Sequence, residues 1–433
     1  MLLMGLDDEY ERALGHVRTI NFNKDYDASF FETAIRYLGG LLGAHALRPD
    51  PILVEKARDL GERLLLGFHS THFGLPQSVI NLETGASHNH NWNGGYSILA
   101  EVGSIQLEFA YLSYITKDNR FYNTARKVFS LYESLESPFG GMFPVYIDAD
   151  NGGWGRRGIH VTMGGLADSF YEYLLKLYLL TGMKDRRVLG MYNRAVDSMI
   201  GNLVLRTPDD TTAYLAEFKD GELRREMEHL SCFVPGMLAL GAKSFDTGKN
   251  KNYNPSKALT PEEAELSAKS ESHMKLAGQL LLGCVSSYDA MITELGPERF
   301  AFDETAPISQ RIKVKEGRYI LRPETVESIF VLYRATGEQK YREMGWRIFE
   351  AIQHHCKTEC CYTGVVDVQQ LPAEPNNSMQ SFFLAETLKY LYLLFSPEGD
   401  AAMDEYVWTT EAHPLPIFKF DEEFDENGLI LDE

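Results

Sequence analysis

Apolar residues recur at spacings of three and four along most of the chain, and short polar turns interrupt this pattern at intervals. Such spacing places apolar side chains on one face of a helix, while Thr, Gly and Asp mark helix ends. Four stretches combine an apolar helix end, a short turn and a second amphipathic helix, and they start at Ala46, Leu112, Leu177 and Leu332. The pattern therefore predicts αα-hairpins at these four places.

The hairpins predict a repeat architecture. One helix pair with its loops covers the interval from Thr116 to Thr181, and units of this length stack into solenoids or close into toroids. We expect one all-α domain over residues 1–416 and an acidic C-terminal tail over residues 417–433. Residues 243–272 are polar and predict a surface excursion.

Long loops separate the hairpins, and three of them are rich in Gly, Pro, Asn and aromatic residues. Loops of this length in a compact domain usually carry function, so we expect them to line a site. Trp92, Tyr96 and Trp154 lie in two of these loops and could form apolar platforms for sugar rings. A tryptophan in a Gly-rich loop equally fits a local packing role, and the sequence leaves both interpretations open.

The segment ILRPETVESIF, residues 320–330, places two acids at the head of an apolar helix. Proline is tolerated at the first helical position, so Pro323 marks the expected start. Glu324 and Glu327 are three residues apart, which puts both carboxylates on one face of that helix. Acids in a first turn also stabilise a helix through its dipole, and on this segment alone that simpler interpretation is favoured.

Three further apolar helices carry an acid: Glu32 with Arg36 one turn later, Asp168 in a Tyr- and Leu-rich helix, and Glu386 among Phe and Leu. Charged side chains are rarely buried unless they are paired or functional. Each acid could belong to a structural ion pair. Their recurrence at comparable positions favours a shared acidic cavity, which suits glycosidic cleavage by paired carboxylates or oxygen ligation of a hard cation such as calcium.

The overall charge limits the classes of molecule that we expect this protein to bind. Acidic residues exceed basic ones by 62 to 42, and the formal net charge of −20 repels nucleic-acid backbones. Hydrophobic residues make up 44% of the chain, but no apolar run is long enough to span a membrane, and the N-terminus lacks the basic start of a signal peptide. Five cysteines without metal-ligand spacing neither prove nor exclude an oxidising compartment. We expect no nucleic-acid partner and no membrane segment in this chain.

Seven segments, in chain order, resemble one known family. They are FFETAIRYLGGLLGAHAL, LAEVGSIQLEFAYLSYIT, GGLADSFYEYLLK, MEHLSCFVPGMLALGA, YILRPETVESIFVLYRATGEQKY, MQSFFLAETLKYLYLLFS and YVWTTEAHPLP. Over nearly the whole chain they resemble the class I α-1,2-mannosidases of glycoside hydrolase family 47. The resemblance implies a seven-hairpin toroid, (αα)7. Family members carry a first helix ahead of the segment with which this sequence starts, so we expect the toroid to lack that helix.

The resemblance implies an enzyme, a mannosyl-oligosaccharide 1,2-α-mannosidase, that removes terminal α-1,2-linked mannose from high-mannose N-glycans with inversion. Glu32 matches the family's acid, which acts through a water; Asp168 matches a second essential carboxylate, and Glu324 matches the base. Thr410 in TTEAHP matches the residue that binds calcium through its hydroxyl and backbone carbonyl, so Ca²⁺ is the implied cofactor. A water held by the metal is the implied nucleophile.

Further residues match family positions around the metal and the sugar. The carboxylates that orient the calcium waters match Glu101, Glu327, Glu386 and Glu411, and the residues around the substrate sugar match Arg36, His229, Arg322 and Phe382. Trp92 is our candidate sugar platform. Leu166 stands where endoplasmic-reticulum-type members carry arginine, whereas Golgi-type members resemble this chain in having an apolar residue. This predicts trimming of several mannoses, because the outer subsite is wider and less charged.

Cys232 and Cys284 match a pair that is disulfide-bonded in the family, and the alternative is two buried free thiols. The resemblance also implies a protein of the secretory pathway, in the Golgi or endoplasmic reticulum lumen, and we expect a monomer that acts on glycoproteins. The alternative function is a weakly or non-hydrolytic mannose-glycan recognition protein of glycoprotein quality control and degradation. Turnover of a glycan distinguishes the two functions.

Overall fold

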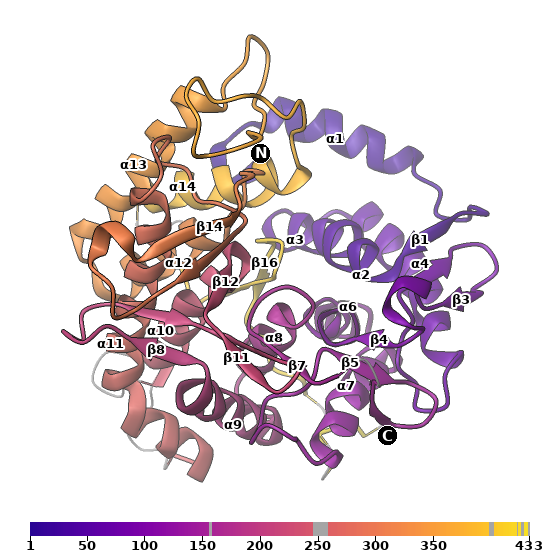
Figure 1. Ribbon diagram of the computed structural model, residues 1–433. Coiled ribbons are helices and arrows are strands. Elements are labelled where there is room, and N and C mark those ends of the chain that lie inside the picture. The colour runs from indigo at the N-terminus through magenta and orange to yellow at the C-terminus, as the bar shows by residue number, and fades with distance from the viewer. Residues whose placement is uncertain (156–157, 246–258, 398–401, 422, 426–427, 432–433) are drawn as a thin grey trace. The chain divides into compact units, whose positions relative to one another are not determined.

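The computed structural model describes residues 1–155, 158–245, 259–397, 402–421, 423–425 and 428–431 (Figure 1). The chain divides into two compact units. Unit 1 comprises Met1–His160, Ser169–Ala195 and Ala401–Glu433, and unit 2 comprises Val161–Asp168 and Val196–Asp400. Within the described residues, no helix combines the length and apolar character needed to cross a membrane. The single domain over 1–416 and the separate tail stay predictions.

All four predicted hairpins are present. They are α3 (Gly39–Leu47) with α4 (Pro51–Leu66), α6 (Gln106–Thr116) with α7 (Asn119–Ser134), α8 (Asp168–Leu180) with α9 (Arg186–Asn202), and α12 (Glu324–Thr336) with α13 (Gln339–His355). Local signals set their ends. Asp50 Oδ1 accepts a hydrogen bond from the Ile52 amide at 2.9 Å and caps α4. Lys117 and Gly337 end α6 and α12 in the left-handed conformation, at φ 56° and 74°.

The remaining elements of unit 1 are short. Its helices are η1 (Leu2–Met4), α1 (Asp7–Thr19), α2 (Phe30–Glu32), η2 (Thr33–Leu38), η3 (Gly67–His69), η4 (Asn91–Asn93) and α5 (Leu99–Val102). Its strands are β1 (Asp27–Ser29), β2 (Val79–Asn81), β3 (Ser87–His88), β4 (Ser97–Ile98), β5 (Tyr146–Asp148), β6 (Gly153–Trp154), β15 (Tyr406–Trp408) and β16 (Pro414–Pro416), and β7 (His160–Val161) begins at its boundary. The strands pair antiparallel as β1-β2-β3, β4-β5-β6 and β15-β16. The sequence pattern predicted long loops here and missed these strands.

Aromatic residues bind the end of the chain to unit 1. Phe418 and Phe420 are buried. Phe418 stacks on Tyr114 of α6 with ring centroids 4.3 Å apart, and Phe420 packs against Tyr122 of α7 at 5.2 Å. The amide of Ile430 donates to the Asn123 side chain at 2.8 Å. Phe418 and Phe420 therefore pack in the core of unit 1.

Helices form the core of unit 2. Besides α12 and α13 it contains η5 (His229–Phe233), α10 (Val234–Phe245), α11 (Pro261–Asp289), η6 (Ile308–Gln310), the π-helix η7 (Phe383–Thr387) and α14 (Leu388–Phe395). Figure 1 shows α12, α13 and α14 packed together, and all three pairs are in contact. The Cys232–Cys284 disulfide joins η5 to α11, with Cα atoms 6.0 Å apart, and confirms the predicted pairing.

The predicted surface excursion over residues 243–272 is wrong from Pro261 onward. Residues 246–258 lie outside the described part of the chain, but α11 begins at Pro261. Thr260 Oγ1 accepts from the Glu263 amide, and the Glu263 carboxylate accepts from the Thr260 amide. This capping box starts a helix inside a polar stretch because it satisfies amides that the helix itself leaves unpaired.

Short strands position the polar residues of unit 2. They are β8 (Val204–Arg206), β9 (Ala213–Leu215), β10 (Glu217–Lys219), β11 (Glu222–Arg224), β12 (Glu226–Glu228), β13 (Arg299–Phe302) and β14 (Ile312–Glu316). The strands β12, β13 and β14 form one antiparallel sheet in which Glu228 lies opposite Arg299. His229 directly follows β12 and Glu298 directly precedes β13. This register brings His229 and Glu298 to the same end of the sheet.

Candidate active site

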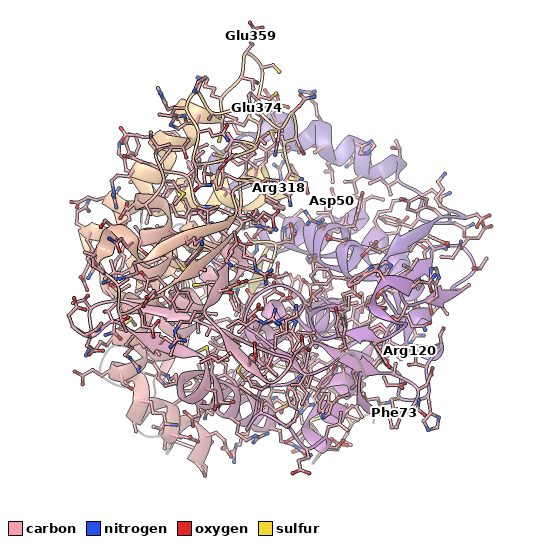
Figure 2. All side chains as sticks on the ribbon, viewed as in Figure 1. Asp50, Phe73, Arg120, Arg318, Glu359 and Glu374 are labelled. Carbon is pink, nitrogen blue, oxygen red and sulfur yellow. A yellow bond between two sulfur atoms is a disulfide. The ribbon has the colours of Figure 1, made fainter. Side chains whose placement is uncertain are left out.

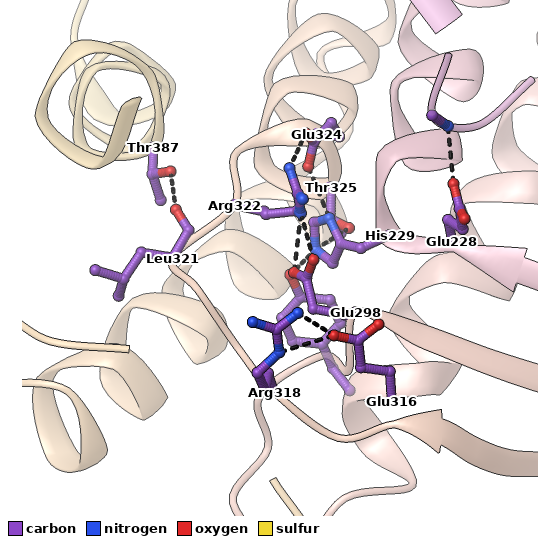
Figure 3. Close-up of polar contacts among 12 residues, drawn as sticks. Glu228, His229, Glu298, Glu316, Arg318, Leu321, Arg322, Glu324, Thr325 and Thr387 are labelled. Atoms are coloured by element: carbon purple, nitrogen blue, oxygen red, sulfur yellow. Dashed lines mark hydrogen bonds and ion pairs between the residues drawn. The ribbon is translucent and has the colours of Figure 1, made fainter. Parts of the chain in front are cut away.

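In unit 2, one histidine and one carboxylate that are 95 residues apart in the sequence meet at the start of α12. His229 Nδ1 lies 2.7 Å from Glu324 Oε2 (Figure 3). On its other side, His229 Nε2 lies 2.6 Å from the Tyr288 hydroxyl and 3.3 Å from Thr325 Oγ1. Because both ring nitrogens have partners, the imidazole is fixed in orientation. His229 and Glu324 were both predicted as site residues.

Helix α12 begins one residue later than expected, with Pro323 as its N-cap and Glu324 as its first residue. Both predicted acids, Glu324 and Glu327, lie in its first turn. Tyr390 of α14 donates a hydrogen bond to Glu327 Oε1 at 3.4 Å, and Glu327 is buried. Both acids therefore lie where the helix dipole stabilises negative charge, and their functional role stays a prediction.

An arginine joins the Glu324 carboxylate to a second acid. Arg322 Nε contacts both oxygens of Glu298 at 2.9 Å, and Arg322 Nη1 lies 3.7 Å from Glu324 Oε1 (Figure 3). The guanidinium also lies 5.8 Å from the ring centre of Phe382. This geometry fixes the plane of the arginine between acids and an aromatic face.

These contacts set the charge of Glu324. Burial pushes the pKa of Glu324 upward, but the hydrogen bond from His229 and the charge of Arg322 outweigh burial, so the pKa lies below its ordinary value. Burial raises the pKa of Glu298, and Arg322 only partly opposes this. Glu324 is therefore the more strongly ionised of the two carboxylates near neutral pH.

The segment before α8 carries Leu166 and Asp168. Leu166 has a positive φ of 75°, and the Asp168 amide donates to the Gly164 carbonyl at 3.0 Å. The Gly165 amide donates to Glu228 Oε2 at 2.8 Å, a contact shown in Figure 3. The backbone of this turn is thus held by β12. Burial lowers the pKa of Arg322, but nearby acids, Asp168 among them, raise it above its ordinary value.

Glu386 and Phe382 lie at the start of the last helical segment of unit 2. Glu386 is in η7, directly before α14, and is buried. The Thr387 hydroxyl donates to the Leu321 carbonyl at 2.6 Å, next to Arg322 (Figure 3). The π-helical turn and the segment entering α12 are therefore tied together. Five predicted residues of unit 2, Arg322, Glu324, Glu327, Phe382 and Glu386, belong to these two segments.

In unit 1, Arg36 connects two predicted carboxylates. Arg36 Nε pairs with Glu32 Oε2 one turn earlier, and Arg36 Nη2 lies 3.2 Å from Glu411 Oε1. Ser29 Oγ accepts from the Glu32 amide at 3.2 Å and caps the short helix α2. Glu32 therefore belongs to an ion pair, as its simpler interpretation predicted. The pair also reaches Glu411, a second site candidate far away in the sequence.

Glu101 lies in the same unit, and its negative charge is only weakly stabilised by its neighbours. Ser78 Oγ donates to Glu101 Oε2 at 2.5 Å. Burial raises the pKa of Glu101, the Ser78 hydrogen bond opposes this, and the negative charge of Glu32 raises the pKa further. A cation near these carboxylates would relieve the electrostatic cost of ionising both.

Thr410 lies in the turn between β15 and β16, and its neighbours fix the turn. The Thr409 amide donates to the His413 carbonyl at 3.0 Å, and the His413 amide donates to Thr409 Oγ1 at 3.1 Å. The Thr410 amide donates to the Tyr173 hydroxyl at 3.4 Å, whereas the Thr410 hydroxyl has no hydrogen-bond partner within the described residues. The turn thus presents an unengaged oxygen donor.

The residues fit a calcium ion by donor chemistry. Calcium takes oxygen ligands from hydroxyls, carbonyls, carboxylates and water. Thr410 offers a hydroxyl next to the buried carboxylate of Glu411, and Glu101 of the same unit needs positive charge nearby. Among the described residues, no group of three or more His, Cys, Asp and Glu side chains is arranged to hold a metal directly.

Trp92 does not have a local packing role. Its side chain is 54% exposed and its ring stacks on His90, with centroids 5.7 Å apart. Trp154 instead packs against Phe143 at 5.8 Å. Trp92 is therefore available as a platform, but its contact with a sugar stays a prediction.

The sequence analysis missed two polar contacts. Glu298 was not singled out because it lies in a loop between helices, without the apolar surroundings that drew attention to the other acids. Glu108 is fully buried in α6 and accepts from the Tyr173 hydroxyl at 2.9 Å. Burial raises the pKa of Glu108 to about 8. An acid in the apolar stretch QLEFAY was a usable signal for this residue.

The hairpins place the chain in the class of helical-hairpin folds, and several of its helices carry buried acids. The chain belongs to glycosyl hydrolase family 47, whose sequence profile matches residues 1–417. It is 39% identical over 420 residues to mannosyl-oligosaccharide alpha-1,2-mannosidase IA of Spodoptera frugiperda, covering 96% of this chain and 59% of that protein. The chain therefore spans about three-fifths of the length of this relative. It is 40% identical to mannosyl-oligosaccharide 1,2-alpha-mannosidase MNS1 of Arabidopsis thaliana, over 96% of this chain and 70% of that protein.

Solved structures agree with this assignment. The alpha-1,2-mannosidase from Trichoderma reesei superimposes with a TM-score of 0.84 and 28% identity, covering 96% of this chain and 88% of that one. The cellobiose 2-epimerase from Spirochaeta thermophila, at TM-score 0.58 and 11% identity, shares the fold alone. The family and the similarity to the Trichoderma enzyme confirm the predicted fold class, an all-α toroid of helical hairpins. The roles of the individual site residues stay predictions.

Proposed function

We propose that this protein is a calcium-dependent α-1,2-mannosidase that removes terminal mannose from high-mannose N-glycans with inversion of configuration. The relatives named as mannosyl-oligosaccharide α-1,2-mannosidases support the activity and the substrate class. The observation that carries the proposal is the Glu324 carboxylate, which His229 and Arg322 keep ionised at the head of α12. A general base must be ionised before it can accept a proton, and the lowered pKa keeps Glu324 in that form.

Glu324 is the general base in this proposal. It accepts the proton of the attacking water while His229 and Arg322 hold its carboxylate in place. Tyr288 and Thr325 fix the imidazole of His229, so the orientation of Glu324 is maintained through the reaction. Inversion requires a water between the base and the sugar, so the base and the acid stand on opposite sides of the scissile bond.

Glu32 is the proposed acid, acting through a water on the leaving oxygen, and Asp168 is the second carboxylate beside the scissile bond. Arg36, which pairs with Glu32 and Glu411, orients both and offers donors to sugar hydroxyls. Phe382, which faces the Arg322 guanidinium, gives an apolar surface for the sugar ring.

Ca²⁺ is the proposed cofactor, held by the hydroxyl and carbonyl oxygen of Thr410 and by waters that Glu101, Glu327, Glu386 and Glu411 orient. When bound, the ion would accept sugar hydroxyls as oxygen ligands and would lower the pKa of a coordinated water. Leu166, an apolar residue before Asp168, favours an outer subsite that accepts several mannose branches. The Cys232–Cys284 disulfide favours the oxidising lumen of the secretory pathway as the working compartment.

The test uses a nine-mannose N-glycan, the purified chain and added calcium. We expect release of mannose as the β-anomer, detected by NMR before mutarotation. Glu324→Gln lowers kcat by at least about 10²-fold because a positioned base contributes roughly that much or more. Glu316→Gln is the matched control, because the Glu316 side chain pairs with Arg318 on the same chain segment (Figure 3). We expect this variant to leave kcat unchanged.

Two results would contradict the proposal. Full activity of Glu324→Gln would remove the base from its role. Tight binding of the glycan by the unaltered chain without any mannose release would instead identify the alternative, a recognition protein. A chelator tests the calcium requirement separately. Activity that persists in its presence would remove calcium from the mechanism and leave the proposed carboxylate roles intact.

A further inference from the structure

The five cysteines occupy three different environments. Cys232 and Cys284 are buried and bonded to each other. Cys356 is buried, and burial raises the pKa of its thiol to about 12, so it stays a thiol under ordinary conditions. Cys360 and Cys361 are both exposed, and their sulfur atoms lie 3.0 Å apart. No function proposed above uses these two adjacent thiols.

A tight turn fixes the two thiols close together. Lys357 and Tyr362 form an antiparallel bridge across its base. The Thr358 amide donates to the Cys361 carbonyl at 2.8 Å, and the Cys361 amide donates to Thr358 Oγ1 at 3.1 Å. Glu359, labelled in Figure 2, lies at the tip of this projecting loop. The turn is thus closed by hydrogen bonds while its tip is open to solvent.

The base of the turn is also held by side chains. The Tyr362 ring lies 4.9 Å from the Phe383 ring, and Gln353 donates a hydrogen bond to the Tyr362 hydroxyl. The Thr363 amide donates to the Cys356 carbonyl at 2.8 Å. Because both ends are anchored, the thiols lose little conformational freedom when they react with each other, which favours an intramolecular reaction over two separate ones.

We propose that Cys360 and Cys361 form a redox site that closes to a disulfide between adjacent residues when it reacts with a low-molecular-weight disulfide such as oxidised glutathione. Thiols of the same class reopen it. The site is separate from the buried Cys232–Cys284 bond and from the carboxylates of the active site.

The reaction has two exchange steps. The Cys361 thiolate attacks one sulfur of the glutathione disulfide, a Cys361–glutathione bond forms, and one glutathione thiolate leaves. Cys360 then gives its proton to solvent, its thiolate attacks Cys361 Sγ, and the second glutathione thiolate leaves. The protein loses two electrons and two protons, and the glutathione disulfide is reduced to two thiols.

Cys361 is the attacking thiol. The hydrogen bond from Cys360, together with the contact of Thr358 Oγ1 at 3.3 Å from its sulfur, lowers the pKa of Cys361. More of it is therefore thiolate, the reactive form. Both sulfurs are exposed, so a tripeptide disulfide can reach them.

The bond is expected to be reversible because of its position in the chain. Adjacent Cα atoms are about 3.8 Å apart across a trans peptide, below the roughly 4.4–6.8 Å that unstrained disulfides span. The Cys232–Cys284 pair, with Cα atoms 6.0 Å apart, lies within that span. A strained and exposed disulfide is more easily reduced, which is the behaviour of regulatory rather than structural bonds.

The experiment follows the thiols themselves and needs no mannosidase assay, so its failure is independent of the proposed function. The full chain is incubated in a series of reduced to oxidised glutathione ratios, the remaining thiols are alkylated, and tryptic peptides are analysed by mass spectrometry. We expect the peptide that starts at Thr358 to lose two hydrogens and to take no alkyl group at oxidising ratios. Cys356→Ala is the control and leaves this transition unchanged.

Single variants test the order of the steps. Cys360→Ser removes the resolving thiol, so the reaction stops with one glutathione on Cys361. Cys361→Ser forms its mixed disulfide at least about threefold more slowly, because it removes the thiol whose thiolate the contacts with Cys360 and Thr358 favour. The reverse ranking would overturn the assignment of Cys361. Alkylation of both thiols, or one glutathione on each, at every ratio in the unaltered chain would overturn the redox site.

Discussion

At the scale of residues, Glu324 shows how a carboxylate can stay charged although it is removed from water. Burial alone would neutralise it by raising its pKa. His229 and Arg322 reverse that effect from two directions, and each is held in turn, His229 by Tyr288 and Arg322 by Glu298. The charge of Glu324 therefore depends on partners that are themselves held in place by other side chains.

The pH profile tests this dependence. His229→Ala removes the hydrogen bond that lowers the pKa of Glu324, so the pKa rises and the acidic limb of kcat/KM shifts to higher pH. We expect a shift of roughly one pH unit, since one charge-assisted hydrogen bond is worth about that much. Activity is lost below the shifted pKa and is retained better above it.

Tyr288→Phe is the companion variant. It removes only the partner of His229 Nε2 and leaves the His229–Glu324 contact, so its acidic limb moves less than that of His229→Ala. Identical profiles for His229→Ala and the unaltered chain, with both proteins folded by circular dichroism, would show that His229 does not control the charge of Glu324.

At the scale of elements, the C-terminal segment shows that an acidic composition does not determine where a segment lies. Asp421 and Glu423 are exposed, but Phe418 and Phe420 are buried against Tyr114 and Tyr122. The sequence analysis interpreted this segment from its charge alone. The aromatic residues Phe418, Phe420 and Phe424 were the better signal.

Removal of one of these rings tests the contribution of the segment. Phe418→Ala leaves a cavity beside Tyr114 and lowers the free energy of unfolding by about 3–5 kcal/mol, as for other buried phenylalanines. Leu431→Ala, at a position that is 51% exposed in the same segment, changes it by less than about 0.5 kcal/mol. Urea unfolding measures both. Equal, small effects would mean that the segment does not hold unit 1 together.

Elements with strong periodicity were predictable, and those fixed by single contacts were not. The four hairpins follow from apolar spacing and turn residues, and α12 begins within one residue of the prediction. The strands of the long loops are two to five residues long and leave no periodic pattern to detect. The start of α11 at Pro261 depends on one capping box in a polar stretch.

The site was predictable where a carboxylate interrupts an apolar helix or a family motif surrounds it. Glu32, Glu324 and Glu386 gave that signal. Glu298 gave none, because its role depends on a strand register that brings it to Arg322. Pairing over such sequence separations is set by tertiary structure, which a single sequence does not display.

At the scale of the whole molecule, one disulfide bond joins two helical elements of unit 2, η5 and α11. The Cys232–Cys284 disulfide closes a loop with a sequence separation of 52 residues. Loop closure of this length restricts the unfolded chain, so Cys232→Ser with Cys284→Ser lowers the free energy of unfolding by about 2–4 kcal/mol. Cys361→Ser, at an exposed thiol, has little effect in the same urea titration. An unchanged midpoint for the double variant would show that the bond does not stabilise unit 2.

Calcium, in the proposed function, binds the folded molecule and not the unfolded chain, so it must also stabilise the fold. At a concentration of about 100 times its Kd, one bound ion adds about 2.7 kcal/mol to the free energy of unfolding. We expect a chelator to lower the melting temperature by several degrees and added Ca²⁺ to restore it. Mg²⁺ restores it poorly, because it demands octahedral geometry and gives up water reluctantly.

The variant Thr410→Val tests whether stabilisation by Ca²⁺ depends on the Thr410 hydroxyl oxygen. Valine keeps the shape of threonine but removes the hydroxyl, which has no other hydrogen-bond partner among the described residues. In the presence of a chelator, the melting temperature of the variant is therefore close to that of the unaltered chain. Added Ca²⁺ raises the melting temperature of the variant only slightly. If Thr410→Val gained as much from Ca²⁺ as the unaltered chain, the ion would bind elsewhere, and the acidic surface of a chain with net charge −20 would be the next place to search.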